Sequence, residues 1–330
     1  MSDVAADTHP FALLTPDYVL DAVESLDLLS DARILTLNSY ENRVYQIGIE
    51  DAEPIIAKFY RPQRWSEAAI LEEHQFTLDL AAAELPVVAP IVIKDQSLFH
   101  YDQFLFAIFP RRGGYAPDFS QLENLNSLGR TLGRIHALGQ RRTLKHRGEF
   151  SLSFFIENSR EYLLESDFLP PHLIDQYRQT SARLLEKMQQ LYQQFDLICL
   201  HGDCHAGNIL WRDNHPHFVD FDDVRMGPAI QDLWMMLSGT LPEQQRQIHE
   251  ILNGYREFCD FNPSELSLIE SLRTMRIMHY AAWLARRWQD PAFPQSFPWF
   301  GEPHYWQEHL NALEQQALLL EQPPLRLGYF

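Results

Sequence analysis

The residues best suited to chemistry lie in the segment 201–208, which reads His-Gly-Asp-Cys-His-Ala-Gly-Asn, and shortly after it. Asp203 precedes Asn208 by five positions, and Asp220 follows Asn208 at the end of an apolar stretch. A hairpin between Asn208 and Asp220 would bring these two side chains to one end of a small sheet. Amide and carboxylate oxygens suit Mg²⁺, which takes its remaining ligands from water and substrate phosphates. The sequence therefore predicts a magnesium site at Asn208 and Asp220.

Asp203 is the carboxylate that this assignment leaves available to orient a hydroxyl and accept its proton. An Asp five positions before a metal-binding Asn, followed by a second metal-binding Asp, is the arrangement used in phosphoryl transfer. The spacing alone is a weak signal, but the preceding His, the flanking apolar strands and the later Asp-Phe-Asp strengthen it. The alternative is an ordinary loop in which Asp203 is a turn residue and Asn208 a cap.

A zinc site is a second interpretation of the same segment, because Cys199, His201, Cys204 and His205 are crowded together. Cys199 and His201 alternate with Leu200 on a predicted strand, and a second, separated ligand pair at finger-like spacing is missing. We therefore expect Cys199 to be a small buried apolar residue and His201 to brace the loop by hydrogen bonding.

Phosphoryl transfer needs residues that hold ATP, and Lys58 is the first candidate. It ends the segment Ile-Ile-Ala-Lys, which is similar to the strand lysine motif V-A-I-K of kinases. Such a lysine contacts the α- and β-phosphates and pairs with a helix carboxylate. Glu73 is the predicted partner and Glu72 the alternative, since adjacent helix positions cannot both face the lysine. A solvated strand lysine is the other interpretation of Lys58.

Two further segments are candidates for binding the nucleotide. The chain has no glycine-rich phosphate loop; residues 38–42, Asn-Ser-Tyr-Glu-Asn, join the first two predicted strands instead. Backbone N–H groups and the Ser39 hydroxyl could bind a phosphate there, although an ordinary Asx turn explains the segment equally well. The second segment runs from Phe109 to Arg111, and we expect its backbone groups to bind the edge of the adenine ring.

The first third of the chain predicts an antiparallel sheet with one inserted helix. The predicted strands cover residues 33–37, 43–49, 54–60, 87–93 and 104–109, and the helix covers residues 67–83. Pro110-Arg111-Arg112-Gly113-Gly114 breaks this pattern. We therefore predict an N-terminal nucleotide-binding lobe over residues 1–109 and a C-terminal catalytic and acceptor lobe over 110–330.

Beyond this boundary the apolar spacing becomes helical, so the second lobe is predicted to be mainly helical with a small catalytic hairpin. The predicted helices cover residues 122–138, 174–195, 269–288 and 307–321, with another beginning at Pro228; short strands are predicted at 197–200, 208–211 and 217–221. The expected class is α+β. Residues 283–306 are rich in aromatics, which we interpret as packing and, alternatively, as one wall of an acceptor site.

Composition narrows the possible partners. The 330 residues include 27 basic and 45 acidic side chains, for a net charge of −18. This disfavours binding to nucleic acid and to anionic membranes. The first seven residues lack the features of a secretory signal, and no segment approaches the length of a membrane span. Three cysteines give no disulfide framework, so we expect a reduced cytoplasmic enzyme.

The motif His-Gly-Asp-x-His-x-x-Asn followed by Asp220 resembles the aminoglycoside phosphotransferase and choline kinase superfamily. Residues 128–136 (LGRTLGRIH), Gly227-Pro228 and Asp232-Leu233 also resemble segments of that superfamily. The resemblance implies a two-lobed protein-kinase-like fold.

The chain is more closely similar to the bacterial stress response kinase A family of serine/threonine protein kinases, from about Leu35 to Trp306. The similar segments are 37–46 (LNSYENRVYQ), 58–65 (KFYRPQRW), 71–76 (LEEHQF), 200–212 (LHGDCHAGNILWR) and 286–299 (RRWQDPAFPQSFPW). The resemblance implies Ser39 near ATP, Asp203 as proton acceptor, and Asn208 and Asp220 on Mg²⁺. It also implies that Asp220 is a second active-site residue, that the enzyme phosphorylates itself, and that it acts in stress survival.

Three functions compete. The first is an ATP- and Mg²⁺-dependent kinase of protein serine and threonine, itself included, acting as a monomer. The second is a small-molecule kinase for an amino alcohol, amino acid or sugar hydroxyl; the short segment between Asp220 and Pro228 favours it, because little room remains for a protein platform. The third is a non-catalytic nucleotide-binding scaffold, which the presence of Lys58, Asp203, Asn208 and Asp220 disfavours.

Overall fold

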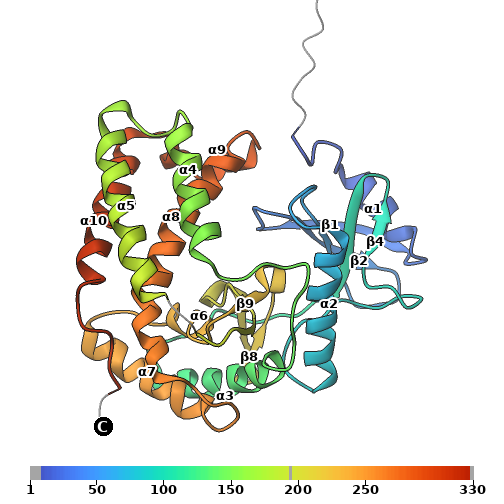
Figure 1. The fold of residues 1–330 in the computed structure, drawn as a ribbon. Helices are drawn as coiled ribbons and strands as arrows, with labels where there is room; N and C mark the ends of the chain where they lie inside the picture. Colours follow the sequence, from blue (N-terminus) through green and yellow to red (C-terminus); the bar gives the residue numbers. More distant parts are fainter. Residues whose placement is uncertain (1–8, 193–194, 328–330) are drawn as a thin grey trace, which may run out of the picture. The chain divides into compact units, whose positions relative to one another are not determined.

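The structure is a computed structural model that describes residues 9–192 and 195–327. The chain forms two compact units (Figure 1). Unit 1 contains the chain up to Pro117 together with Lys145–Arg147 and Ala206–Asp223, and unit 2 contains the remaining segments. Residues 1–8, which include the segment assessed as a possible signal, lie outside the described residues.

Unit 1 is built on a five-stranded antiparallel sheet in the order β1-β2-β3-β5-β4. Its strands are β1 (Ser30–Leu37), β2 (Arg43–Ile49), β3 (Ile55–Phe59), β4 (Phe99–Tyr101) and β5 (Phe104–Pro110), and its helices are α1 (Pro16–Glu24) and α2 (Glu67–Ala82). The Ser66 side chain caps α2 by accepting a hydrogen bond from the Ala69 N–H at 3.2 Å. The predicted antiparallel sheet with a helix after its third strand is confirmed, but the unit also contains α1, which was not predicted.

Lys58 lies on the central strand of this sheet, opposite Val44 on β2 and Ala107 on β5. Its neighbour Phe59 points to the apolar core of the unit and stacks on Phe106, with ring centroids 5.2 Å apart. Because successive side chains of a strand point to opposite faces, Lys58 lies on the face away from this core. The strand therefore holds the lysine rigidly.

The strand predicted over residues 87–93 is wrong. Only isolated bridges occur there, from Val87 to Phe218 and from Ile93 to Gln96. Pro86 and Pro90 interrupt this segment, and proline cannot donate to a ladder of hydrogen bonds. The strand that completes the sheet is β4, which the sequence analysis missed because it is only three residues long.

Unit 1 also includes the hairpin of β7 (Ile209–Arg212) and β8 (His215–Phe218). Asp213 and Asn214 form its two-residue turn, and both have positive φ, 51° and 62°. Asp and Asn tolerate this left-handed conformation, which a tight hairpin turn requires. Phe218 joins the hairpin to the rest of the unit, because its N–H donates to the Pro86 carbonyl and its own carbonyl accepts from the Val88 N–H.

Unit 2 is mainly helical, and its only sheet among the described residues pairs β6 (Ile198–Leu200) with β9 (Arg225–Gly227). Its helices are α3 (Leu122–Gly139), α4 (Asn158–Glu165), α5 (Ile174–Leu191), α6 (Gln231–Trp234), α7 (Leu241–Tyr255), α8 (Ile269–Arg287), α9 (Ala292–Ser296) and α10 (Pro303–Leu319). Short helical turns cover Ser153–Glu157, Pro171–Leu173, Pro263–Leu268 and Pro298–Gly301. This arrangement confirms the predicted α+β class.

Three predicted helices differ from the observed ones. The helix predicted over 307–321 is observed over Pro303–Leu319. The helix expected from Pro228 begins only at Gln231, and the helix predicted over 174–195 is described as far as Leu191, with residues 193 and 194 outside the described part of the chain. No helix of the described residues is both long and apolar enough to cross a membrane.

Glycines allow α3 and α7 to pack closely. A Cβ atom on Gly129 would lie 1.9 Å from the carbonyl oxygen of Ile251, and one on Gly133 would lie 2.4 Å from that of Tyr255. Because any side chain at these positions would collide with backbone, the two helices can approach only where α3 carries glycine. The spacing of four residues places both glycines on one face of α3.

His309 on α10 is a buried histidine in an aromatic environment. Its ring stacks between Tyr177 and Tyr305, with centroid distances of 6.0 and 5.9 Å, and its Nε2 has no hydrogen-bond partner. Burial lowers the pKa of His309 to about 4, because the surroundings do not solvate an imidazolium. The unfolded chain therefore binds this proton near pH 6.5 and the folded chain only near pH 4.

We expect the variant His309→Phe to lose less stability in acid than the parent protein. Stability rises with pH wherever the unfolded state binds more protons, so the histidine destabilises the fold as pH falls from about 6.5 towards 4, by ~2 kcal/mol at pH 5. Urea unfolding between pH 5 and 7.5 measures the difference in slope. Burial raises the pKa of Glu265 to about 7, so this group stabilises the fold as the pH falls. Its contribution is the same in the variant and in the parent protein.

His304→Phe is the matched control, because His304 is exposed on the same helix. If the free energy of unfolding changes with pH in the same way in His309→Phe and in the parent protein, His309 does not contribute to the acid sensitivity.

Candidate active site

Lys58 is buried in unit 1 and held by two carboxylates. Its Nζ donates to Asp220 Oδ1 at 2.9 Å and lies 3.2 Å from Asp222 Oδ1, while only 7% of its side chain is exposed. Burial alone lowers the pKa of Lys58, but the charges of Asp220 and Glu73 outweigh it and raise the pKa above its ordinary value. The structure thus gives a fully charged lysine at a fixed position, and not the solvated strand lysine considered as the alternative.

Glu73 does not form the predicted pair with Lys58. Its Oε2 accepts from Arg147 Nη2 at 2.7 Å, and both side chains are buried. Glu72, the alternative partner, accepts instead from the backbone N–H groups of residues 145–147, at 2.6, 2.8 and 3.2 Å. Both helix carboxylates thus hydrogen-bond to the segment 145–147, although the charge of Glu73 still acts on Lys58.

Arg147 connects α2 to the loop that follows Asp220. Besides Glu73 it donates to the carbonyl oxygens of Ala69, at 2.8 Å, and of Asp222, at 2.5 Å. Its guanidinium also lies over the ring of Trp65, 4.3 Å from the centroid. Glu73 therefore influences the site in two ways, through its charge on Lys58 and through Arg147, which positions the backbone of the loop.

Asp222 is engaged on both of its oxygens. Oδ1 faces Lys58, and Oδ2 accepts from Asn42 Nδ2 at 3.1 Å and from Arg64. Its side chain is almost fully buried, so Asp222 is a structural anion that orders the loop. Asn42 belongs to the polar segment 38–42, which is thereby tied to the loop after Asp220. The half-buried Ser39 lies in the same segment, and its contact with ATP stays a prediction.

Asn208 and Asp220 lie at the same end of the β7–β8 hairpin, as predicted. The Val219 N–H donates to the Asn208 carbonyl at 3.0 Å, which places Asp220 one residue beyond this pair. Asp220 has a φ of 58°, and 51% of its side chain is exposed. A carboxylate accepts several contacts, so Asp220 can hold Lys58 through one oxygen and still bind a cation. An amide oxygen and a half-exposed carboxylate fit a divalent metal that is completed by phosphate and water.

Asp203 belongs to unit 2, in a loop anchored by the fully buried Asp232. The Asp232 carboxylate accepts from the backbone N–H groups of His201 at 2.8 Å and Gly202 at 2.9 Å. It also accepts from His136 Nε2 at 3.1 Å. These bonds fix the backbone just before Asp203. In the sequence Asp232 is visible only as part of a family resemblance, because its anchoring contacts join residues about 30 positions apart.

The Asp203 carboxylate contacts two side chains of its own unit. Oδ1 accepts from Arg276 Nη1 at 2.5 Å, and Oδ2 lies 3.3 Å from His205 Nε2. Burial raises the pKa of Asp203, but the hydrogen bond of His205 and the charge of Arg276 outweigh it and hold the pKa below its usual range. Asp203 is therefore ionised, as a proton acceptor must be.

Cys199 is buried, as predicted, and so are Cys204 and His201, whose burial was not predicted. Cys199, Cys204 and His201 each have no exposed surface. Burial raises the pKa of the Cys204 thiol well above its ordinary value, which disfavours the thiolate that a metal would need. Cys199 lies on β6 with its backbone paired to Met226, and His201 Nδ1 accepts from the Asp203 N–H at 3.4 Å.

Phe109 and Arg111 lie at the end of β5. The backbone of Phe109 is opposite Ile56, and its ring packs edge-on against His74. Arg111 is exposed and donates from Nε to Gln46 at 2.9 Å. Their contact with adenine stays a prediction.

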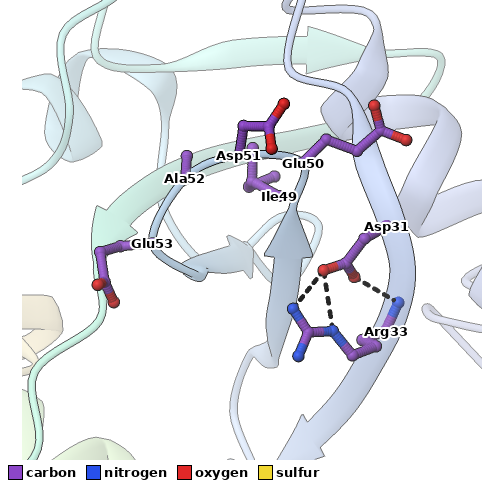
Figure 2. A pocket seen from close by; sticks show the side chains of 7 residues that line it. All are labelled: Asp31, Arg33, Ile49, Glu50, Asp51, Ala52 and Glu53. Atoms are coloured by element: carbon purple, nitrogen blue, oxygen red, sulfur yellow. Dashed lines mark hydrogen bonds and ion pairs between the residues drawn. The ribbon is translucent and has the colours of Figure 1, made fainter.

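A hollow on the surface of unit 1 lies elsewhere on the sheet and includes none of the predicted site residues (Figure 2). It is lined by Asp31, Arg33, Ile49, Glu50, Asp51, Ala52 and Glu53. Four of these side chains are acidic, and the single arginine is paired with Asp31. Such a surface repels phosphate, so we do not assign nucleotide binding to it.

Comparison with protein families gives a match of residues 33–269 to the phosphotransferase enzyme family. Stress response kinase A of Escherichia coli O157:H7 is 43% identical to this chain over 318 residues, 96% of this chain and 97% of the relative. The serine/threonine protein kinase RdoA of Salmonella typhimurium strain LT2 is 42% identical over the same shares.

Solved structures of low sequence identity share the fold. A microcompartment-associated aminopropanol kinase is 16% identical with a TM-score of 0.73, covering 95% of this chain and 100% of that one. An amicoumacin kinase in complex with AMP-PNP, Ca²⁺ and Ami is 19% identical with a TM-score of 0.68, covering 88% and 92%. A spectinomycin phosphotransferase in complex with ADP is 18% identical with a TM-score of 0.61, covering 91% and 98%.

Proposed function

Because this chain belongs to the phosphotransferase enzyme family, we propose that it is an ATP- and Mg²⁺-dependent kinase of serine and threonine in proteins, itself included. The names of the relatives and their similarity over nearly the whole chain support this function and a role in bacterial stress response. We further propose that it acts as a cytoplasmic monomer, with a nucleotide-binding lobe over residues 1–109 and a catalytic and acceptor lobe over 110–330. This functional division counts Asn208 and Asp220 with the catalytic lobe, although their hairpin belongs to the compact unit 1.

The observation that carries this proposal is the ion pair of Lys58 with Asp220 on the same unit as Asn208. A charged, immobile lysine next to a half-exposed carboxylate is suited to bind phosphates together with a divalent cation. We assign Lys58 to the α- and β-phosphates, and Asn208 and Asp220 to Mg²⁺. The complexes of similar folds with AMP-PNP and Ca²⁺ or with ADP support the use of a nucleotide and a divalent cation.

The remaining predicted residues take supporting roles. We assign Ser39 to a phosphate, the backbone from Phe109 to Arg111 to adenine, and Glu73 to positioning through Arg147. In the transfer itself, the acceptor oxygen forms a bond to the γ-phosphorus while the bond from that phosphorus to the bridging oxygen breaks, and ADP leaves. The proton of the acceptor hydroxyl passes to Asp203, with Asp220 as the second active-site carboxylate.

The alternative is a small-molecule kinase. The solved structures named after aminopropanol, amicoumacin and spectinomycin share this fold, and the segment from Asp220 to Pro228 is short. The positive charge of Arg276, which contacts the proposed base Asp203 directly, argues against a cationic acceptor.

Incubation with γ-labelled ATP and Mg²⁺ distinguishes the two functions. The protein is assayed alone, with a generic protein substrate, and with small alcohols, and each arm is repeated with EDTA. We expect label on serine or threonine of the enzyme and of the added protein, and none with EDTA. Phosphate transfer that requires a small alcohol, with no label on protein, would establish the alternative.

A further inference from the structure

Arg276 on α8 contacts the proposed catalytic base, and its only role described above is to help keep that carboxylate ionised. Its Nη1 contacts Asp203 Oδ1 at 2.5 Å, and 46% of its side chain is exposed. Other arginines of this helix are held differently: Arg273 pairs with Glu270 and lies over Trp234, and Arg286 lies over Tyr162. Arg276 is thus a partly exposed cation next to the atom that must receive the proton.

The contact with Arg276 has a consequence for the reaction. With Oδ1 facing Arg276 and Oδ2 facing His205, both oxygens of Asp203 already have a donor nearby. An acceptor hydroxyl can hydrogen-bond to a remaining lone pair of this carboxylate, beside Arg276, or can displace one of the two donors. Arg276 is the more exposed of the two, 46% against 38% for His205, and its guanidinium has five N–H donors with which to bind a second anion.

The same face of α8 continues with aromatic side chains. Tyr280 and Trp283 follow Arg276 at spacings of four and three residues, so the three lie on one side of the helix. Their rings stack, with centroids 5.6 Å apart, and both lie within 6.5 Å of Phe297. Tyr280 is exposed. The positive charge of Arg276 and the aromatic rings that follow it along α8 suit a peptide with an acidic side chain next to its acceptor serine or threonine.

We propose that Arg276 is a specificity-determining residue that binds a carboxylate of the protein substrate beside the acceptor serine or threonine, with Tyr280 and Trp283 packing against the substrate chain. The favoured substrate is therefore an acidic segment of a protein. A cationic acceptor would meet the like charge of Arg276, which disfavours binding. This inference rests on the proposed function, in which Asp203 accepts the proton of the acceptor hydroxyl.

Two serine peptides that differ only in their flanking residues, Glu or Lys, test the inference. With γ-labelled ATP and Mg²⁺ we expect kcat/KM to be at least tenfold higher for the acidic peptide. Arg276→Gln should lower this ratio by about tenfold to a hundredfold, chiefly through KM, as loss of a charged hydrogen bond does. Arg276→Lys should restore part of the preference, and Arg276→Glu should favour the basic peptide.

Arg178→Gln is the matched control, because Arg178 is a half-exposed arginine of the same unit that pairs with Asp175. It should leave the preference unchanged. An unchanged ratio in Arg276→Gln, or a parent enzyme that prefers the basic peptide, would overturn the inference.

Binding of the same peptides with alanine in place of serine separates this inference from the proposed function, because binding needs no phosphoryl transfer. Fluorescence anisotropy should show tighter binding of the acidic peptide to the parent than to Arg276→Gln. If binding differs in this way but no serine peptide is phosphorylated, the surface is supported and the kinase assignment fails. Equal binding of acidic and basic peptides overturns the surface, whatever the activity.

Discussion

Asp203→Asn is expected to fold and bind nucleotide but to transfer phosphate ~10²–10⁴-fold more slowly, the usual cost of losing a general base. Asparagine has nearly the same shape as aspartate and keeps an oxygen that can accept from Arg276. The loop should stay in place because Asp232 holds the backbone N–H groups of His201 and Gly202, and not the Asp203 side chain. The substitution therefore removes the proton acceptor with little other change.

The rate is measured with γ-labelled ATP under single-turnover conditions, beside thermal unfolding and the affinity for a non-hydrolysable ATP analogue. We expect the melting temperature and the affinity to stay close to those of the parent. Asp213→Asn is the matched control, because Asp213 is an exposed carboxylate at the β7–β8 turn, where asparagine also tolerates the positive φ. Turnover at the parental rate in Asp203→Asn would remove Asp203 from its role as base.

The parts of the site that the sequence could predict depend on short-range structure. Asn208 and Asp220 flank a short hairpin, so two apolar strands and a turn were enough to place them together. Lys58 could be placed on a strand because its segment has a clear β-branched and aromatic pattern, whereas the central position of that strand came only from the structure. In each case neighbouring residues in the sequence determine the local backbone, and the backbone sets the position of the side chain.

The partners of these residues could not be predicted in the same way. Lys58 and Asp220 are 162 positions apart, and Arg147 and Glu73 are 74 apart. The sequence motif suggested a helix carboxylate for Lys58, yet Arg147 competes for Glu73 from a segment with no strand or helix of its own. The contact of Arg276 with Asp203 has no local signal either. Only the packing of segments far apart in the sequence decides between such charged partners.

Asp220→Asn is expected to weaken the affinity for Mg²⁺-ATP by ~10²-fold or more, in addition to slowing transfer. Replacing groups that only support a metal ligand typically costs 10–100-fold, so loss of the ligand charge itself should cost at least as much. Asparagine is preferable to alanine here, because Asp220 has a φ of 58° and asparagine adopts that conformation with less strain. Asp222 keeps its contact with Lys58, so the lysine should remain in place.

A titration of Mg²⁺ at fixed nucleotide concentration separates metal binding from the lysine contact. If Asp220 binds the metal, nucleotide affinity in Asp220→Asn should recover partly as Mg²⁺ is raised, because a weaker metal site is being filled. If Asp220 only holds Lys58, the loss of nucleotide affinity should be the same at every Mg²⁺ concentration. Asp223→Asn is the matched control, since Asp223 lies in the same loop and pairs with Arg64. A Mg²⁺ dependence equal to that of the parent would exclude Asp220 as a metal ligand and leave its contact with Lys58 as its contribution.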